Sequence, residues 1–308
     1  MKHQRDELIN CIFESAKNDN NIYFLSADFG APALDKFRTE LPKQFIHCGI
    51  SEQHMIDMAV GLSLDGNKVF CYAMAPFVTL RCLEQHKCGA SIMNLPIVTI
   101  VAGVGFGYAD AGPTHYATED LACLRSMIGA SVYTASDASI SKEIAKHLLQ
   151  EPKFSFIRLD RNPSIDFEPF FIDKSIPEGF RIYGNKLNEL CIITSGYMYG
   201  KTLSFLKEKG LNDKCFLIDL IRVKPFPDIE HVISKAKNVL IVDEQTSYGS
   251  LSSAFLEYMC DANFTKNVHR MFVPDKHFFD NGGRETIHSL AGISNKHIEN
   301  KILKILNF

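Results

Sequence analysis

The sequence has 308 residues, 46% of them hydrophobic, with 33 Lys and Arg against 36 Asp and Glu. This length favours two domains, each large enough to bury its own core. A formal net charge of −3 offers no basic surface for a phosphate backbone, which excludes a sequence-independent nucleic-acid binder. Partners have to be recognised through local sites.

In the first half of the chain, apolar runs rich in Val, Ile and Phe alternate with segments of helical period. The predicted strands are residues 22–27, 45–47, 68–73, 96–102, 131–134 and 154–159. The predicted helices are residues 5–17, 52–64, 77–93, 119–127 and 138–149. Several strands are apolar at nearly every position, as strands covered on both faces are. The alternation predicts a mostly parallel α/β sheet flanked by helices.

The alternation of predicted strands and helices stops in a stretch that contains Pro and Phe, and a second series of strands and helices follows it. Its predicted strands are residues 190–194, 215–219, 238–243 and 268–272. Its predicted helices are residues 201–209, 228–235, 250–261 and 297–306. We therefore expect a first domain at 1–165, a linker at 166–187 and a second α/β domain at 188–308.

The cysteines and the N-terminus indicate the compartment. Nine Cys are scattered singly without a CxxC pair, which argues against a disulfide framework and a structural zinc site. The first residues carry charges where a signal peptide needs an apolar run, and no stretch reaches the about 18 apolar residues of a membrane span. We expect a soluble, cytoplasmic protein with neither a membrane nor a nucleic-acid partner.

A glycine run, Gly103, Gly105 and Gly107, superficially resembles a dinucleotide-binding turn. No helix of consistent period opens directly behind it, and its third glycine is misplaced. The glycines are better explained as positions where the backbone approaches a ligand or a neighbouring chain closely.

The most informative stretch is HCGISEQHM, residues 47–55, where a strand ends, a glycine turns the chain and an acid begins a helix. Taken alone, Glu52 is explained as a helix N-terminal acid stabilised by the helix dipole, with Ser51 as its cap. The other segments of the first half change this interpretation.

Five segments of the first half are informative because of their order and spacing along the chain: SADFG (26–30), HCGISEQHM (47–55), APFVTLRCLEQ (75–85), GPTH (112–115) and FIRLDR (156–161). Together they resemble the pyrimidine-binding domain of the transketolase family, and the later α/β unit resembles that family's C-terminal domain. The resemblance implies a thiamine-diphosphate-dependent enzyme. We interpret the chain as the C-terminal half of a split transketolase-like enzyme.

The resemblance assigns roles around the cofactor. In such enzymes a glutamate hydrogen-bonds N1′ of the aminopyrimidine and promotes its imino tautomer, which makes Glu52 a catalytic and cofactor-binding residue. Asp28 would lie near the cofactor, although a turn cap explains it equally. Phe77 and Arg81 match the region that covers the pyrimidine face, and deoxyxylulose-phosphate synthases place an arginine in register with Arg81. Phe77 could equally be a core residue.

Three further residues match substrate positions. His115 in GPTH matches a histidine that faces the substrate, where an imidazole can move protons or bind a hydroxyl. Arg161 and Arg158 match the end of the domain where transketolases bind the substrate phosphate, for which the guanidinium fork is suited. An interdomain salt bridge explains both arginines equally well.

The chain departs from the family pattern at the substrate positions. Transketolases carry a histidine at the position of Gly103 and an aspartate at that of Ala111; Asp110 is displaced by one residue. Serine and threonine contacts are replaced by residues 30–32, Gly-Ala-Pro. These losses remove donors for a sugar phosphate. They put pentose phosphates in doubt and favour an altered carbonyl acceptor, such as a modified or nucleotide-linked sugar.

The family's GDG motif, which binds diphosphate and Mg²⁺, is not found in the sequence. The one similar string, residues 64–67, lies in a predicted turn without room for the motif. We therefore expect no metal ligands in this chain. A separate N-terminal transketolase-like subunit would carry the diphosphate and Mg²⁺ site, most simply in an α2β2 assembly.

The sequence thus predicts the C-terminal subunit of a two-chain enzyme that transfers a two-carbon ketol unit from a ketose-like donor to a carbonyl acceptor, with small-molecule sugars as substrates. One alternative is the β subunit of an acyl-transferring 2-oxo acid dehydrogenase, but GISEQHM and GPTH fit transketolase better. Another is a non-catalytic subunit that stabilises its partner, whose mark would be loss of the activating acid. Glu52 is present.

Overall fold

A seven-stranded sheet forms the core of the first half of the chain in the computed structural model, which describes residues 1–27, 30–164, 176–211 and 213–307. Its strand order is β10-β5-β6-β4-β3-β1-β2, with all neighbours parallel except β10 and β5. The strands are β1 (Ile22–Ala27), β2 (Phe45–Gly49), β3 (Lys68–Met74), β4 (Ile97–Ala102), β5 (Ser131–Thr134), β6 (Ser155–Leu159) and β10 (Arg222–Lys224).

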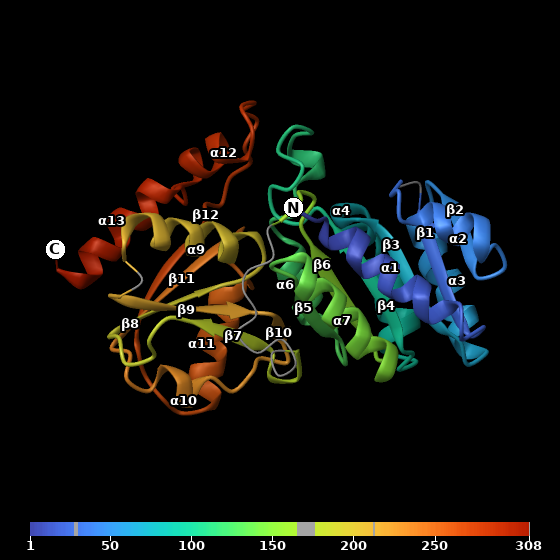
Figure 1. Cartoon of the computed structure of the whole chain (residues 1–308), viewed down its shortest axis with the longest axis horizontal. Helices are drawn as coiled ribbons and strands as arrows, with labels where there is room; N and C mark the ends of the chain where they lie inside the picture. Colours follow the sequence, from blue (N-terminus) through green and yellow to red (C-terminus); the bar gives the residue numbers. More distant parts are fainter. Residues whose placement is uncertain (28–29, 165–175, 212, 308) are drawn as a thin grey trace.

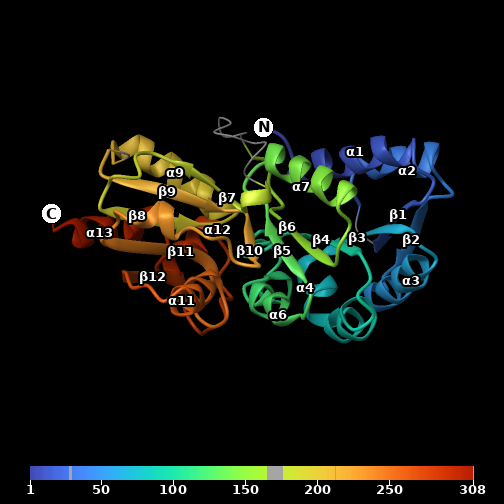
Figure 2. The ribbon, with the colours of Figure 1, turned by 90° about the horizontal axis from the view of Figure 1, so that it is seen from below.

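Helices cover both faces of this sheet (Figure 2). On one face lie α1 (Gln4–Ala16), α2 (Leu34–Glu40) and α7 (Ala138–Gln150). On the other lie α3 (Glu52–Leu64), α4 (Ala75–Val78) and α6 (Asp120–Ser126). Every residue of β4, β5 and β6 is buried, because a parallel sheet with helices on both sides exposes neither face.

The predicted helix at 77–93 is broken into four pieces. After α4 come a 3₁₀ segment η1 (Leu80–Cys82), the short α5 (Leu83–Gln85) and a π-helical stretch η2 (His86–Ser91). At the break, the buried Thr79 hydroxyl donates to the carbonyl of Ala75 at 2.7 Å. The ring of the buried His86 hydrogen-bonds the carbonyl of Val78 at 2.9 Å. Burial lowers the pKa of His86 to about 4, so a neutral imidazole satisfies the carbonyl that the break releases.

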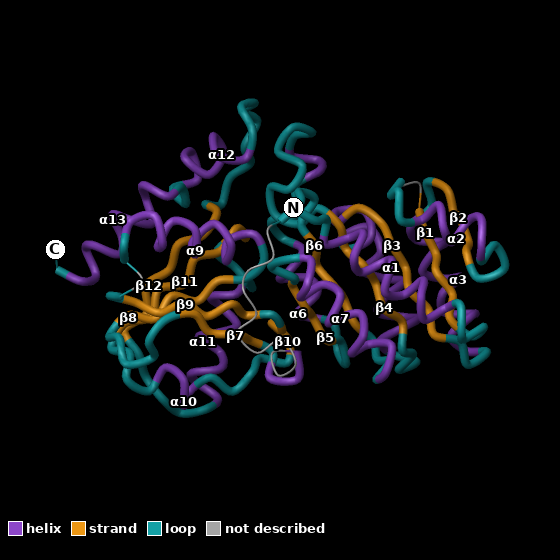
Figure 3. The backbone as a smooth tube through the Cα atoms, viewed as in Figure 1, coloured by secondary structure: helices purple, strands orange, loops and turns teal. Residues whose placement is uncertain are grey.

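A five-stranded sheet in the order β12-β11-β8-β9-β7 forms the second unit, and Figure 3 shows helices flanking both sheets. Its strands are β7 (Phe180–Tyr183), β8 (Leu190–Thr194), β9 (Cys215–Leu220), β11 (Asn238–Thr246) and β12 (Asn267–Val273). One face packs against α9 (Tyr197–Lys209), α12 (Arg284–Ala291) and α13 (Asn295–Leu306), the other against α10 (Glu230–Ile233) and α11 (Leu251–Asp261).

The predicted fold class, two mostly parallel sheets flanked by helices, is confirmed. The strands β7 and β10 and the helices α2 (Leu34–Glu40) and α12 (Arg284–Ala291) were not predicted. Strand β7 lies inside the stretch assigned as the linker and pairs antiparallel with β9, and residues 165–175 of that stretch lie outside the described residues. The predicted domain limits otherwise stay a prediction.

The two units lie side by side and are joined in several places (Figure 1). Strand β10 follows β9 of the second sheet but pairs with β5 of the first. From β7, Arg181 donates to Asp219 of its own sheet at 2.8 Å and to Asp137 of the first unit at 2.7 Å. These crossing contacts show that the units share a continuous buried interface.

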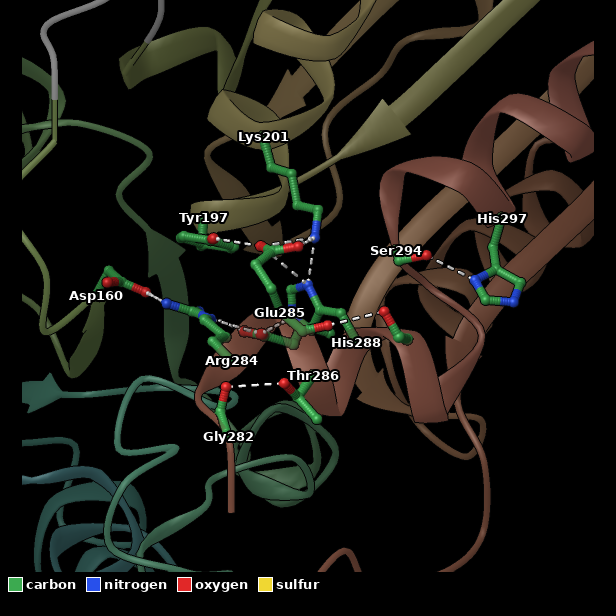
Figure 4. Close-up of polar contacts among 12 residues, drawn as sticks. Asp160, Tyr197, Lys201, Gly282, Arg284, Glu285, Thr286, His288, Ser294 and His297 are labelled. Atoms are coloured by element: carbon green, nitrogen blue, oxygen red, sulfur yellow. Dashed lines mark hydrogen bonds and ion pairs between the residues drawn. The ribbon is translucent and has the colours of Figure 1, made fainter. Parts of the chain in front are cut away.

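A buried group that we call the interdomain cluster consists of Asp160, Glu244, Arg284 and His288. Figure 4 labels Asp160, Arg284 and His288 of this group. From the start of α12, Arg284 donates to Asp160 at 2.6 Å and to Glu244 at 2.7 Å. His288 also hydrogen-bonds Glu244. Burial by itself raises the pKa of Glu244, but the charges and hydrogen bonds of Arg284 and His288 outweigh it and hold that pKa well below its usual range.

Two absences hold for the described residues. None of their helices has both the length and the apolar character needed to cross a bilayer. None of their His, Cys, Asp and Glu side chains gather in groups of three or more that could hold a metal ion.

Candidate active site

Glu52 is placed at a strand-to-helix turn. Strand β2 ends at Gly49, whose φ of +67° is a left-handed conformation that favours glycine, and Glu52 is the first residue of α3. Only 6% of Glu52 is exposed. Ser51 does not cap the helix through its side chain, because its hydroxyl donates back to the carbonyl of Cys48. The turn therefore presents a nearly buried carboxylate at the carboxyl end of a sheet strand, where open α/β sheets bind ligands.

Arg81 and Phe77 lie against this carboxylate. Nη1 of Arg81 donates to Oε2 of Glu52 at 2.7 Å, and the guanidinium carbon lies 4.5 Å from the centre of the Phe77 ring. Phe77 belongs to α4 and Arg81 to η1, so both side chains come from the broken helix. A π-helical stretch nearby is a common mark of functional sites.

His115 completes this group. It ends a short 3₁₀ turn, η3 (Pro113–His115), and its ring lies edge-on to Phe77 with the ring centres 5.4 Å apart. Its Nδ1 lies 2.9 Å from the hydroxyl of Thr114. The structure thus brings together four of the predicted residues, and we call Glu52, Phe77, Arg81 and His115 the Glu52 cluster.

Tyr108 occupies the space beside Gly103. A Cβ on Gly103, whose φ is +82°, would lie 2.0 Å from Cε2 of Tyr108. Glycine is therefore required for the Tyr108 ring to lie against the backbone. A Cβ on Gly105 would likewise lie 2.1 Å from Oε2 of Glu244. These glycines therefore allow side chains from elsewhere in this chain to pack against the backbone.

Arg161 lies next to this ring at the edge of the site. Its guanidinium carbon is 4.5 Å from the centre of the Tyr108 ring, and its Nη1 donates to the exposed Asp110 at 2.5 Å. The Tyr108 ring is also 6.4 Å from that of His115. Tyr108 therefore connects Arg161 to the Glu52 cluster.

Sequence reasoning missed Tyr108 and Arg5. Burial raises the pKa of Tyr108, and the charges of Arg161 and Arg5 oppose that rise. Tyr108 directly follows the glycine run, and the glycine at position 103, where transketolases carry a histidine, was the only signal for it. No motif pointed to Arg5, which lies in the first turn of α1.

The structure does not place Arg158 with these residues. It is buried, with Nε and Nη2 donating to both oxygens of Asp120 at 2.8 and 2.9 Å and Nη1 donating to Thr134 at 3.0 Å. These bonds occupy all of its guanidinium nitrogens, and the salt bridge lies within the first unit; the role of Arg158 as a substrate ligand stays a prediction. Asp28 lies outside the described residues, and its role stays a prediction.

Family models match both halves of the chain. Residues 5–164, slightly more than half of it, match "Transketolase, pyrimidine binding domain", and residues 184–298 match "Transketolase, C-terminal domain".

The chain belongs to the transketolase family.

Among curated relatives, one subunit of the apulose-4-phosphate transketolase of Phocaeicola vulgatus is 29% identical over 274 residues, which is 83% of each chain. The 1-deoxy-D-xylulose-5-phosphate synthase of Chlamydia felis is 24% identical over 282 residues, which is 89% of this chain but 43% of that protein. This transketolase-family chain thus spans less than half the length of that relative.

Solved structures show the same fold. A structure described as "Split gene transketolase, inactive beta4 tetramer" superposes with a TM-score of 0.85 at 22% identity, over 100% of this chain and 99% of that one. A transketolase variant from Pichia stipitis superposes with a TM-score of 0.76 at 15% identity, over 98% of this chain and 45% of that one. The predicted relation to a transketolase split between two chains is confirmed.

Proposed function

We propose that this chain is the C-terminal subunit of a two-chain transketolase-like enzyme. In the proposed reaction, thiamine diphosphate carries a two-carbon ketol unit from a ketose-like donor to a carbonyl acceptor. The observation that carries the proposal is the nearly buried carboxylate of Glu52, at the strand-to-helix turn of a transketolase pyrimidine-binding domain. Support for a partner comes from the apulose-4-phosphate transketolase relative, which is itself named as a subunit.

The residues present fit the pyrimidine half of the cofactor. Glu52 offers a carboxylate sheltered from water, and Phe77 and Arg81 provide an aromatic face and a planar cation beside it. When bound, thiamine diphosphate supplies the carbanion chemistry. In our proposal Glu52 holds N1′ of the aminopyrimidine, and its burial excludes competing water. The diphosphate and Mg²⁺ would be held by the N-terminal subunit.

At the substrate end, we assign His115 to hold or move a proton at a substrate oxygen. Arg161, beside the Tyr108 ring at the edge of the site, would face the far end of the substrate, where a guanidinium suits an anionic or hydroxyl group. Tyr108 fills the room beside Gly103 that a histidine takes in transketolases. This change of side chain at the substrate end supports a specialised acceptor, and we propose a modified or nucleotide-linked sugar.

The test is Glu52→Gln in the complex with the N-terminal subunit. We expect assembly to be retained, while turnover and exchange of the thiazolium C2 proton fall by about 10²–10⁴-fold, the usual contribution of a positioned acid or base. Glu84→Gln, an exposed glutamate on α5, is the matched control and should leave both rates unchanged. Undiminished exchange in Glu52→Gln would show a subunit that only stabilises its partner.

A second measurement tests the partner. Thiamine diphosphate and Mg²⁺ are titrated by calorimetry into this chain, into the N-terminal subunit and into their mixture. We expect tight binding by the mixture alone, with a mass that fits α2β2. Tight binding by this chain alone would contradict a cofactor shared between two subunits.

A further inference from the structure

Arg81 makes two contacts that fix its guanidinium between a carboxylate and an aromatic ring. Its Nη1 donates to Glu52 at 2.7 Å, and its carbon lies 4.5 Å from the centre of the Phe77 ring. Its side chain is 43% exposed, whereas that of Glu52 is only 7% exposed. Arg81 therefore lies between solvent and the buried acid.

The carboxylate depends on this one cation. A buried charge is costly unless it is paired and hydrogen-bonded. Among the residues that the structure describes, Arg81 is the one ion-pair partner of Glu52, and it engages Oε2. The other oxygen, Oε1, has no side-chain donor in that part of the chain, so it is the oxygen left for a ligand.

The same geometry limits what else Arg81 can do. One face of the guanidinium is occupied by Phe77 and one edge by Glu52. A guanidinium is a rigid planar fork, so holding it on two sides also fixes the carboxylate that it binds. Phe77 in turn contacts His115, which connects Phe77 and Arg81 to the short turn η3.

We infer that Arg81 is a positioning residue that acts through Glu52: it holds Oε2 and orients Oε1 toward N1′ of the aminopyrimidine. This inference rests on the proposed function of Glu52. It assigns to Arg81 a role in activating the cofactor, beyond covering its ring.

The experiment is a double-mutant cycle in the assembled two-subunit enzyme at saturating thiamine diphosphate and Mg²⁺. Arg81→Met keeps an unbranched, flexible side chain but removes the charge and the fork. We expect C2 proton exchange to slow by about tenfold, a typical coupling between contacting groups. In a Glu52→Gln background the same change should have no further effect, because the oriented carboxylate is already gone. Arg81→Lys should restore part of the rate, since it keeps the charge.

Two controls separate the outcomes. Arg38→Met, at an exposed arginine on α2, should leave exchange unchanged. Calorimetry should give a cofactor Kd for Arg81→Met within about threefold of the parent, because the lost contact orients the acid more than it holds the ring. A weaker Kd with unchanged exchange at saturation would overturn the inference and assign Arg81 to the ring face.

Failure of the inference is distinguishable from failure of the proposed function. If Glu52→Gln slows exchange and Arg81→Met does not, only the role of Arg81 is wrong. If the two variants slow exchange independently, their effects multiply and Arg81 acts by another route. If neither slows it, the proposed function itself is wrong.

Discussion

Two arginine–glutamate contacts in this chain use the same chemistry in different surroundings. In the interdomain cluster, Arg284 binds Glu244 through two nitrogens and Asp160 through a third, and all three side chains are at most 7% exposed. In the Glu52 cluster, Arg81 makes one bond to Glu52 and remains 43% exposed. In the first group Arg284 is paired with two acids, whereas in the second Oε1 of Glu52 has no side-chain donor among the described residues.

The difference in exposure between the two arginines distinguishes a structural ion pair from one that can take part in ligand binding. In the interdomain cluster every charge meets an opposite charge, so a ligand that bound these charged groups would compete with the bonds that join the two units. In the Glu52 cluster the acid is buried while its partner is open to solvent, which leaves one carboxylate oxygen for another molecule. We therefore expect changes in the first group to act on stability and changes in the second to act on the cofactor and substrate.

The largest effect on stability should come from Arg284→Met, because it leaves Glu244 and Asp160 buried without their cation. Removing one partner of a buried ion pair costs about 3–5 kcal/mol in the free energy of unfolding. Urea unfolding of the full chain measures it. Arg38→Met, which removes an exposed pair with Asp35, should cost about 0–1 kcal/mol. Equal losses in the two variants would break the comparison.

A smaller effect concerns Asp243, which precedes Glu244 in β11. Burial raises its pKa to about 6, against the charge of Arg158, and its Oδ2 accepts from the backbone N–H of Leu251. Because this pKa exceeds the unfolded value of about 3.9, the folded state favours the neutral acid. That contribution is complete below pH 4 and is lost as the pH rises through 6.

Asp243→Asn should therefore stabilise the chain increasingly at higher pH, since the amide mimics the neutral acid. The gain should grow by about 1 kcal/mol between pH 5 and pH 8. Unfolding by urea at both pH values checks it, with Asp261→Asn at an exposed helix end as the control. A gain that does not change with pH would show that burial does not control this carboxyl.

Local patterns predicted the regular elements well. Helix α3 and strands β1, β5 and β8 have the predicted limits, because apolar periodicity and turn residues act over a few neighbours. The helix predicted at 77–93 is broken, because the buried Thr79 and His86 provide alternative bonds to its carbonyls. Periodicity does not register such side-chain bonds.

Long-range contacts explain what the sequence did not reveal. Arg158 and Arg161 both lie in FIRLDR, yet Arg158 pairs with the buried Asp120 and Arg161 with the exposed Asp110. Strand alternation predicts that residues three positions apart point to opposite faces. It does not identify their partners, because these lie 38 and 51 residues away in the sequence. Helix α12 and its Arg284 were missed for the same reason, since the partners of Arg284 come from distant strands.

The smallest effect should come from Asp110→Asn at the open site. Both members of its pair with Arg161 are exposed, so the free energy of unfolding should change by no more than about 1 kcal/mol. Binding of an anion should improve instead, because Asp110 competes for the guanidinium. Titration of the assembled enzyme with inorganic phosphate, followed by calorimetry, should show tighter binding in Asp110→Asn and weaker binding in Arg161→Met. If Asp110→Asn instead unfolds the chain as readily as Arg284→Met, the open pair is structural, and the contrast between the two regions fails.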